Sequence, residues 1–179
     1  RAPLMSAPKM ARTIALWLAF VPVCSRATAA PAAPSPVPSV LAARVEREVA
    51  VALAPALSDY EWFHAHPELS EQESATAARL AQKLRALGME VHEGIGGHGL
   101  VGILRAKNPR GRVVLYRADM DGLPVTEATG LTYASLAPGV MHACGHDVHM
   151  ANALGTLAVL KTLDDVWSGT VFFVAQPAE

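Results

Sequence analysis

The sequence predicts an α/β fold in which helices pack against a largely parallel sheet. Segments with apolar residues at helical spacing alternate with short apolar runs of strand length. The later runs, over 112–116 and 170–175, are apolar on both faces. Buried strands that alternate with helices are typical of parallel sheets with helical cover. The 51% hydrophobic content of the 179 residues is ample for the core of one domain.

Two helices are expected in the first half of the folded part. Apolar spacing predicts an amphipathic helix over 39–57, with Pro55 as a kink or an end. Ser70 and Glu73 have the spacing of a capping box, with Ser70 as N-cap, and the helix that follows stops at Gly88.

The remaining elements are bounded by glycine, proline and asparagine. They are predicted strands at 89–92, 100–104, 112–116 and 170–175, and a helix from about 147 to 163. The short aromatic segment between the first two helices holds His64 and His66. Because side chains two apart do not share a helix face, we expect this segment to pack against the domain and not to bind metal.

The first 38 residues differ in kind from the rest. Lys9 and Arg12 precede an apolar run over 14–24 and then small residues up to Ala30, the pattern of a secretory signal peptide. The run is too short to span a bilayer, which takes about 20 residues. The sequence predicts a signal peptide (1–30), a Pro/Ala-rich linker (31–38) and a folded part (39–179), exported to the periplasm or outside the cell without a stable membrane anchor. A net charge of -1 and no basic stripe argue against a nucleic-acid partner.

A cluster of metal-ligand side chains lies between the last predicted loop and helix. From His142 to His149 the chain holds three imidazoles, one thiol and one carboxylate. Cys144 and His146 flank a glycine, so both side chains can reach one ion, and thiolate with imidazole suits borderline-soft divalent metals. His149 is three residues beyond His146 and remains an alternative ligand. A capped helix start with incidental histidines is the competing interpretation.

Polar groups follow each of the last two strands as well. Asp119 and Asp121 come after the strand at 112–116, and Glu179 comes after the strand at 170–175. Ligands of open α/β sheets bind beyond the carboxyl ends of the strands. We therefore expect these acids and the Cys/His cluster to meet in space.

Four motifs in order resemble those of a known family. They are His66–Ser70 (HPELS), Arg117–Pro124 (RADMDGLP), Gly139–Asp147 (GVMHACGHD) and Gln176–Glu179 (QPAE). Their order is similar to that of the metal-dependent amidohydrolases that include hippurate hydrolase, bacterial N-acyl-amino-acid amidohydrolases and plant auxin-conjugate hydrolases. The resemblance covers the chain from about Tyr60 to Glu179.

The resemblance implies a three-layer α/β sandwich of the zinc-exopeptidase type around two divalent ions (zinc, manganese, cobalt or nickel). Cys144 and His146 match metal ligands, and Glu179 matches the general acid/base. Asp121 is expected to orient a ligand, as Asp119 could, although either could instead cap the loop. Three further ligands are expected beyond Glu179. A lid or dimerisation domain, through which a homodimer or tetramer would form, is also expected outside this chain.

The function expected of the complete protein is two-metal hydrolysis of the amide bond in a small-molecule N-acyl-amino acid. This chain matches an N-terminal fragment with an incomplete catalytic domain, so it should be inactive alone. A related aminopeptidase or dipeptidase is an alternative. A non-catalytic metal-binding or substrate-binding relic is another.

Overall fold

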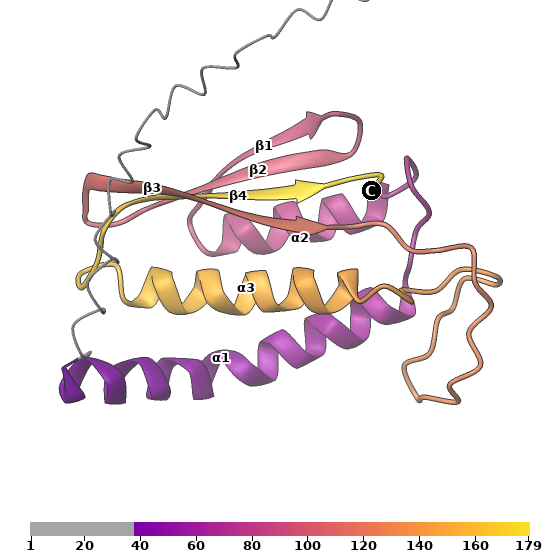
Figure 1. The fold of residues 1–179 in the computed structure, drawn as a ribbon, viewed down its shortest axis with the longest axis horizontal. Coiled ribbons are helices and arrows are strands. Elements are labelled where there is room, and N and C mark those ends of the chain that lie inside the picture. The colour runs from indigo at the N-terminus through magenta and orange to yellow at the C-terminus, as the bar shows by residue number, and fades with distance from the viewer. Residues whose placement is uncertain (1–37) are drawn as a thin grey trace, which may run out of the picture. The chain divides into compact units, whose positions relative to one another are not determined.

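The computed structural model describes residues 38–179 (Figure 1). The predicted signal peptide and residues 31–37 of the predicted linker lie outside the described residues. The described part holds three helices and four strands. They are α1 (Ser39–Ala65), α2 (Ser74–Ala86), β1 (Glu90–Ile95), β2 (Gly99–Arg105), β3 (Asn108–Asp119), α3 (His146–Thr162) and β4 (Ser168–Gln176).

The four strands form one mixed sheet in the order β1-β2-β4-β3. β1 pairs antiparallel with β2, and β2 pairs antiparallel with β4. Only β3 and β4 are parallel, with Val114 opposite Val171 and Asp119 opposite Gln176. The α/β class is therefore confirmed, but the prediction of a largely parallel sheet was wrong. The apolar runs that suggested it belong to β3 and β4, which are the two parallel strands.

The helices cover one side of the sheet. Figure 1 shows α1, α2 and α3 on the same side, with α3 between the sheet and α1. The core lies beneath the sheet, where Leu100 of β2 and Phe173 of β4 are fully buried together with Leu84 of α2 and Leu157 of α3. Among the described residues, the outer layer of the expected three-layer sandwich is not represented.

Helix α1 is longer than predicted. It runs through Pro55 and includes the aromatic segment that was expected to follow it. Figure 1 shows a bend along the helix, as expected where proline removes a backbone hydrogen bond. The aromatic turn is held by packing, because Phe63 is fully buried in the core.

The predicted capping box does not form. α2 begins at Ser74, and the Glu68 carboxylate accepts hydrogen bonds from the backbone N–H groups of Ala75 (3.0 Å) and Thr76 (2.7 Å). A carboxylate at this position also complements the positive end of the helix dipole. Ser70 lies ahead of the helix and is free to make a tertiary contact.

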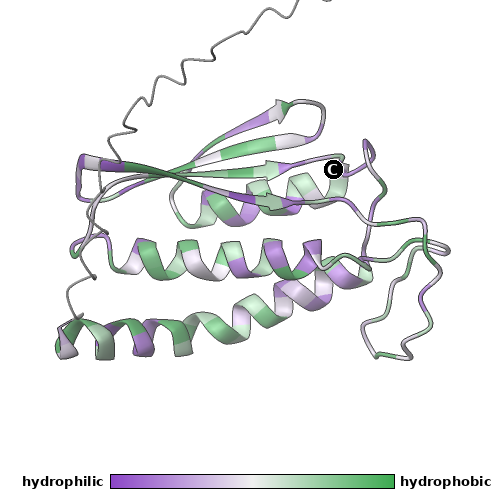
Figure 2. Cartoon of the chain, in the orientation of Figure 1, coloured by the Kyte–Doolittle hydropathy of each residue, from purple (hydrophilic) through white to green (hydrophobic). Residues whose placement is uncertain are grey.

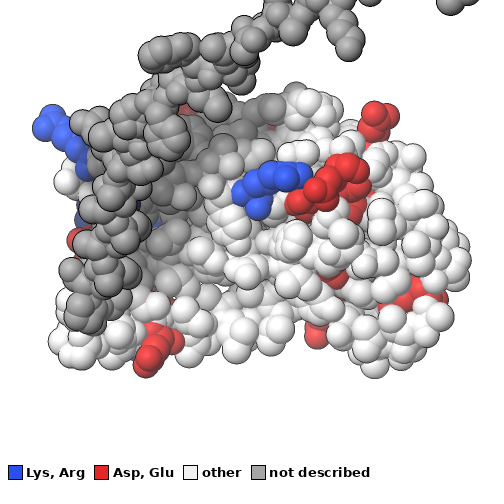
Figure 3. All heavy atoms as spheres, in the orientation of Figure 1, with Lys and Arg blue, Asp and Glu red and all other residues white. Residues whose placement is uncertain are grey.

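Apolar residues are exposed on α1 and on β3. Val51, Leu53 and Leu57 of α1 and Val113 and Leu115 of β3 are all more than half exposed. Figure 2 shows apolar residues along much of α1, and the face drawn in Figure 3 has few charged side chains. No described helix is long and apolar enough to cross a membrane.

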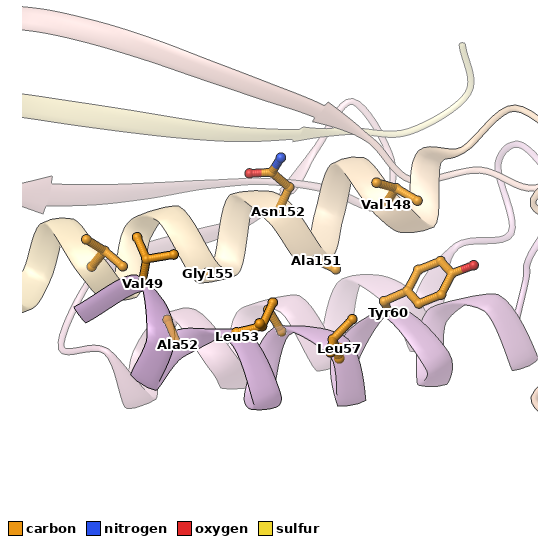
Figure 4. Close-up of a pocket in the computed structure, with 11 residues that line it drawn as sticks. Val49, Ala52, Leu53, Leu57, Tyr60, Val148, Ala151, Asn152 and Gly155 are labelled. Atoms are coloured by element: carbon orange, nitrogen blue, oxygen red, sulfur yellow. The ribbon is translucent and has the colours of Figure 1, made fainter. Parts of the chain in front are cut away.

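A groove of about 440 Å³ runs between α1 and α3 (Figure 4). Its walls are apolar side chains of the two helices, among them Leu53 and Leu57 of α1 and Val148 and Val159 of α3. The candidate metal ligands described below do not line it. The groove is therefore suited to apolar contacts.

Candidate active site

The ends of β3 and β4 meet the first turn of α3 at one edge of the sheet. Because β3 and β4 are parallel and in register, Asp119 and Gln176 lie side by side, and the acids beyond them follow at the same edge. α3 starts at His146, directly after Gly145, whose φ of 84° is readily adopted only by glycine. The expected convergence of three segments is confirmed.

His146 is the buried centre of this arrangement. Its Nδ1 lies 2.9 Å from the backbone oxygen of Asp121 and 3.2 Å from Asp121 Oδ1. These acceptors favour the tautomer with the proton on Nδ1, which leaves a lone pair on Nε2. Nε2 lies 3.0 Å from Glu179 Oε2. Two facing lone pairs repel, so this contact is favourable only with a shared proton or a bound cation.

Glu179 is held from a second direction by Arg117. The guanidinium donates to Glu179 Oε1 at 3.3 Å and also pairs with the Asp119 carboxylate. The side chain of Glu179 is 48% exposed, so it can reach both water and a substrate. Arg117 and Asp119 project on the same side of β3 because they are two residues apart.

Asp121 is almost fully buried behind His146. Its Oδ2 accepts a hydrogen bond from Ser70 Oγ at 2.7 Å. One oxygen therefore faces the histidine while the other is held by the hydroxyl. This is the geometry of a carboxylate that fixes the orientation of a metal-binding imidazole.

The donor set suits a divalent ion. Asp119, His146 and His149 each offer a ligand atom within 4.8 Å of the others. The rings of His146 and His149 are stacked, with centroids 5.6 Å apart. Imidazole and carboxylate donors are those used for zinc and manganese. Cys144 is exposed on the loop before α3 and is not one of this group.

His142 is buried next to the cluster. Neither of its ring nitrogens has a hydrogen-bond partner among the described residues. Burial lowers the pKa of His142 to about 4, although the nearby Asp147 carboxylate acts in the opposite direction. The imidazole is therefore neutral near pH 7.

A second buried network includes Asp147 in the first turn of α3. His64 Nδ1 is 2.6 Å from Asp147 Oδ2, and His64 Nε2 is 3.2 Å from Glu127 Oε1. Burial opposes the charged imidazole, but the hydrogen bonds to Asp147 and Glu127 outweigh it and raise the pKa of His64. His64 therefore links α1 to α3 and to the loop after β3. This agrees with the prediction that its segment packs against the domain.

Three residues of this region were not singled out from the sequence as parts of the site. Arg117 contacts Glu179, Ser70 contacts Asp121, and Glu73 accepts a hydrogen bond from the backbone of Ala178 at 2.8 Å. Arg117 and Asp119 are two residues apart, so on a strand they share one face. This spacing is a signal that could have identified Arg117. Ser70 and Glu73 match a local capping motif, so the sequence offered a competing explanation for both.

The α/β fold and the buried histidine–carboxylate cluster are compatible with a metal-dependent hydrolase. Residues 115–179 match the model of a family described as Peptidase family M20/M25/M40. This match agrees with the resemblance that the four motifs indicated.

Curated relatives match the chain over about 65% of its length. The chain is 48% identical over 118 residues to thermostable carboxypeptidase 1 of Saccharolobus solfataricus. It is 45% identical over 117 residues to hippurate hydrolase of Campylobacter jejuni. Each match covers 30% of the relative, so the chain spans less than a third of their length.

Solved structures share the fold. A putative aminohydrolase from methicillin-resistant Staphylococcus aureus has a TM-score of 0.72 and 36% identity, covering 76% of this chain and 36% of that protein. A dinuclear metal-binding peptidase of the M20 family from Bacillus subtilis has a TM-score of 0.66 and 34% identity, covering 77% and 36%.

Proposed function

We propose that the full-length protein is a metal-dependent amidohydrolase that cleaves the amide bond of N-acyl-amino acids. The observation that carries this proposal is the contact of His146 with both Asp121 and Glu179, which joins three separate segments at one edge of the sheet. The names of the relatives, among them a hippurate hydrolase, support an N-acyl-amino acid as the substrate class.

The proposed metal centre involves two divalent ions, with Cys144 and His146 as ligands from this part of the chain. Asp119 and His149 are further donors within reach of His146. When bound, such ions polarise a carbonyl and lower the pKa of water.

Glu179 is the proposed general acid/base. Its half-exposed carboxylate accepts a proton from the attacking water as the oxygen bonds to the amide carbon, and it then gives that proton to the nitrogen as the C–N bond breaks. A free amino acid and a carboxylic acid are the products. Arg117 holds one oxygen of Glu179 and Asp121 fixes the His146 ring, so both act by orientation.

The test is hydrolysis by the purified full-length protein loaded with metal. We expect hippurate and N-acetyl-amino acids to be cleaved faster than free dipeptides, and Glu179→Gln to lower kcat by about 10²- to 10⁴-fold with the metal content unchanged. Glu93→Gln, on β1, is the matched control and should keep wild-type activity.

The alternatives give different results. Faster cleavage of free dipeptides would identify an aminopeptidase or dipeptidase. Release of the C-terminal residue from N-blocked peptides is the outcome that the carboxypeptidase relative favours. Binding of metal and substrate without turnover would leave a non-catalytic protein, and full activity of Glu179→Gln would remove Glu179 from the mechanism.

A further inference from the structure

Glu73 is a carboxylate with no exposure to solvent. One oxygen, Oε1, accepts the backbone N–H of Ala178 at 2.8 Å, across 105 residues of sequence. The other, Oε2, has no hydrogen-bond partner among the described residues. Burying a carboxylate oxygen without a partner is costly, so the residue at this position requires an explanation.

Capping of α2 does not explain Glu73. Although Glu73 directly precedes the helix, its side chain makes no capping hydrogen bond. The first free N–H groups of α2, on Ala75 and Thr76, are taken by Glu68. The polar contact that the Glu73 side chain does make is with the segment after β4.

The end of β4 and the segment after it are held at three consecutive residues, 176–178. The backbone oxygen of Gln176 accepts the N–H of Met120 at 3.0 Å. Pro177 packs closely against Gly99, where a Cβ would lie 2.9 Å from the proline ring. Ala178 has a φ of 53°, a left-handed conformation that side chains disfavour, and its N–H is held by Glu73. Glu179 comes next in the chain.

We infer that Glu73 is a positioning residue for Glu179. Glu73 accepts the backbone N–H of Ala178 and so stabilises the left-handed conformation of Ala178. This conformation directs the Glu179 carboxylate to its position, with Oε2 3.0 Å from His146 Nε2. The inference rests on the proposed role of Glu179 as general acid/base. Small displacements of such a group cost large factors in rate, since proton transfer needs hydrogen-bond distance.

The test compares two substitutions in the metal-loaded full-length protein. Glu73→Gln keeps an acceptor oxygen at the same reach but removes the charge. Glu73→Asp keeps the charge but withdraws the acceptor by one methylene. We expect Glu73→Asp to lower kcat about 10- to 100-fold with KM and metal content little changed. Glu73→Gln should stay within about threefold of wild-type kcat because its hydrogen bond remains.

A double variant separates positioning from general destabilisation. If Glu73 acts through Glu179, Glu73→Asp added to Glu179→Gln should lower the residual kcat no further, because residues that act as a unit are not additive. A second, independent loss would contradict the inference. Thermal melting of each variant accompanies the kinetics.

Each result bears on one hypothesis. An inactive Glu179→Gln beside a fully active Glu73→Asp would overturn this inference and leave the proposed function intact. An active Glu179→Gln would overturn the proposed function itself. If Glu73→Asp does not fold, the test rests on Glu73→Gln. A folded, metal-loaded Glu73→Gln with kcat tenfold or more below wild type would contradict the inference, because glutamine supplies an acceptor oxygen at the same reach.

Discussion

The two ring nitrogens of His146 have different tasks. Nδ1 lies against Asp121, which is itself held by Ser70, and Nε2 points toward Glu179 and the edge of the sheet. A histidine fixed in this way presents one lone pair in one direction and loses little freedom when it binds an ion. Ser70 and the buried Asp121 therefore fix the orientation of the His146 ring, and the ring presents Nε2 toward the exposed edge of the site.

The proposed role of Cys144 as a metal ligand can be tested directly by substitution. In the full-length protein we expect Cys144→Ser to lose most of the bound metal and nearly all turnover, because a hydroxyl is a far poorer ligand than a thiolate. The thiol is exposed, so the substitution should leave the fold intact. Elemental analysis beside amide hydrolysis measures both effects.

His149→Asn is the comparison for Cys144→Ser. If Cys144 and His146 are the ligand pair, His149→Asn keeps more metal than Cys144→Ser does. Wild-type metal content in a folded Cys144→Ser, with loss in His149→Asn, would transfer the ligand role to His149, which lies with His146 and Asp119.

The His64 network predicts a pH-dependent contribution to stability. The folded-state pKa of His64 is raised by Asp147 and Glu127 against the effect of burial. The stabilisation is thus fully present below the unfolded-state pKa of about 6.5 and is lost as the pH rises through the raised folded-state value. The rings of Tyr60 and Tyr133 also face His64, but the pKa of Tyr60 is raised to about 12 by burial, so it stays neutral in this range.

His64→Leu should therefore lower the free energy of unfolding by about 3 kcal/mol near pH 6, since it leaves two buried carboxylates without their partner. The difference from wild type should shrink toward pH 9. Chemical unfolding between pH 5.5 and 9 measures it. Arg44→Leu, which breaks the exposed pair with Asp165, is the control and should show little change at any of these pH values. A His64→Leu difference that grows with pH would refute the assignment.

At the scale of elements, the start of α2 links helix stability to the site. Glu68→Ala should lower the free energy of unfolding by about 1 kcal/mol, because the N–H groups of Ala75 and Thr76 lose their acceptor. Ser70→Ala should leave the helix unaffected but free Asp121, and so lower turnover. Urea unfolding and hydrolysis of both variants distinguish this arrangement from a capping box, in which Ser70→Ala would be the destabilising change.

The positions of most elements followed from local periodicity. The strand at 170–175 and the helix at 147–163 agree with β4 and α3 to within two residues at each end. Pairing direction did not follow, because β2 and β4 are antiparallel neighbours separated by β3 and α3, and strand periodicity is the same in either direction. For Pro55 the alternative of a kink agrees with the bend of α1 (Figure 1), whereas the alternative of a helix end was wrong, because α1 continues to Ala65 and Phe63 packs in the core.

The proximity of candidate site residues could be predicted where it follows from the order of the strands. Asp121 and Glu179 follow the two strands that are parallel neighbours, so their meeting with His146 could be expected. Glu73 and Ser70 reach the site from a different part of the chain, and their local sequence fits a helix cap equally well. Side chains whose partners are about 50 and 105 residues away give no local signal of that contact.

At the scale of the whole molecule, apolar surface remains uncovered in residues 38–179. β3 is an edge strand of the described sheet, and its Val113, Val114 and Leu115 are 69%, 51% and 64% exposed. An apolar strand with an open edge is a template for pairing between chains. The apolar groove between α1 and α3 adds a second such surface (Figure 4).

We therefore expect residues 38–179, expressed alone, to self-associate and to melt without a cooperative transition. Val114→Lys places a charge on the exposed edge strand and should reduce association, since charged residues on edge strands oppose pairing. Val51→Lys, on the exposed part of α1, is the matched control for added charge away from the sheet and should reduce association less. Light scattering and sedimentation across a concentration series measure the difference. A monodisperse, cooperatively melting monomer of residues 38–179 would contradict the prediction, because it would mean that this surface is stable in water without cover.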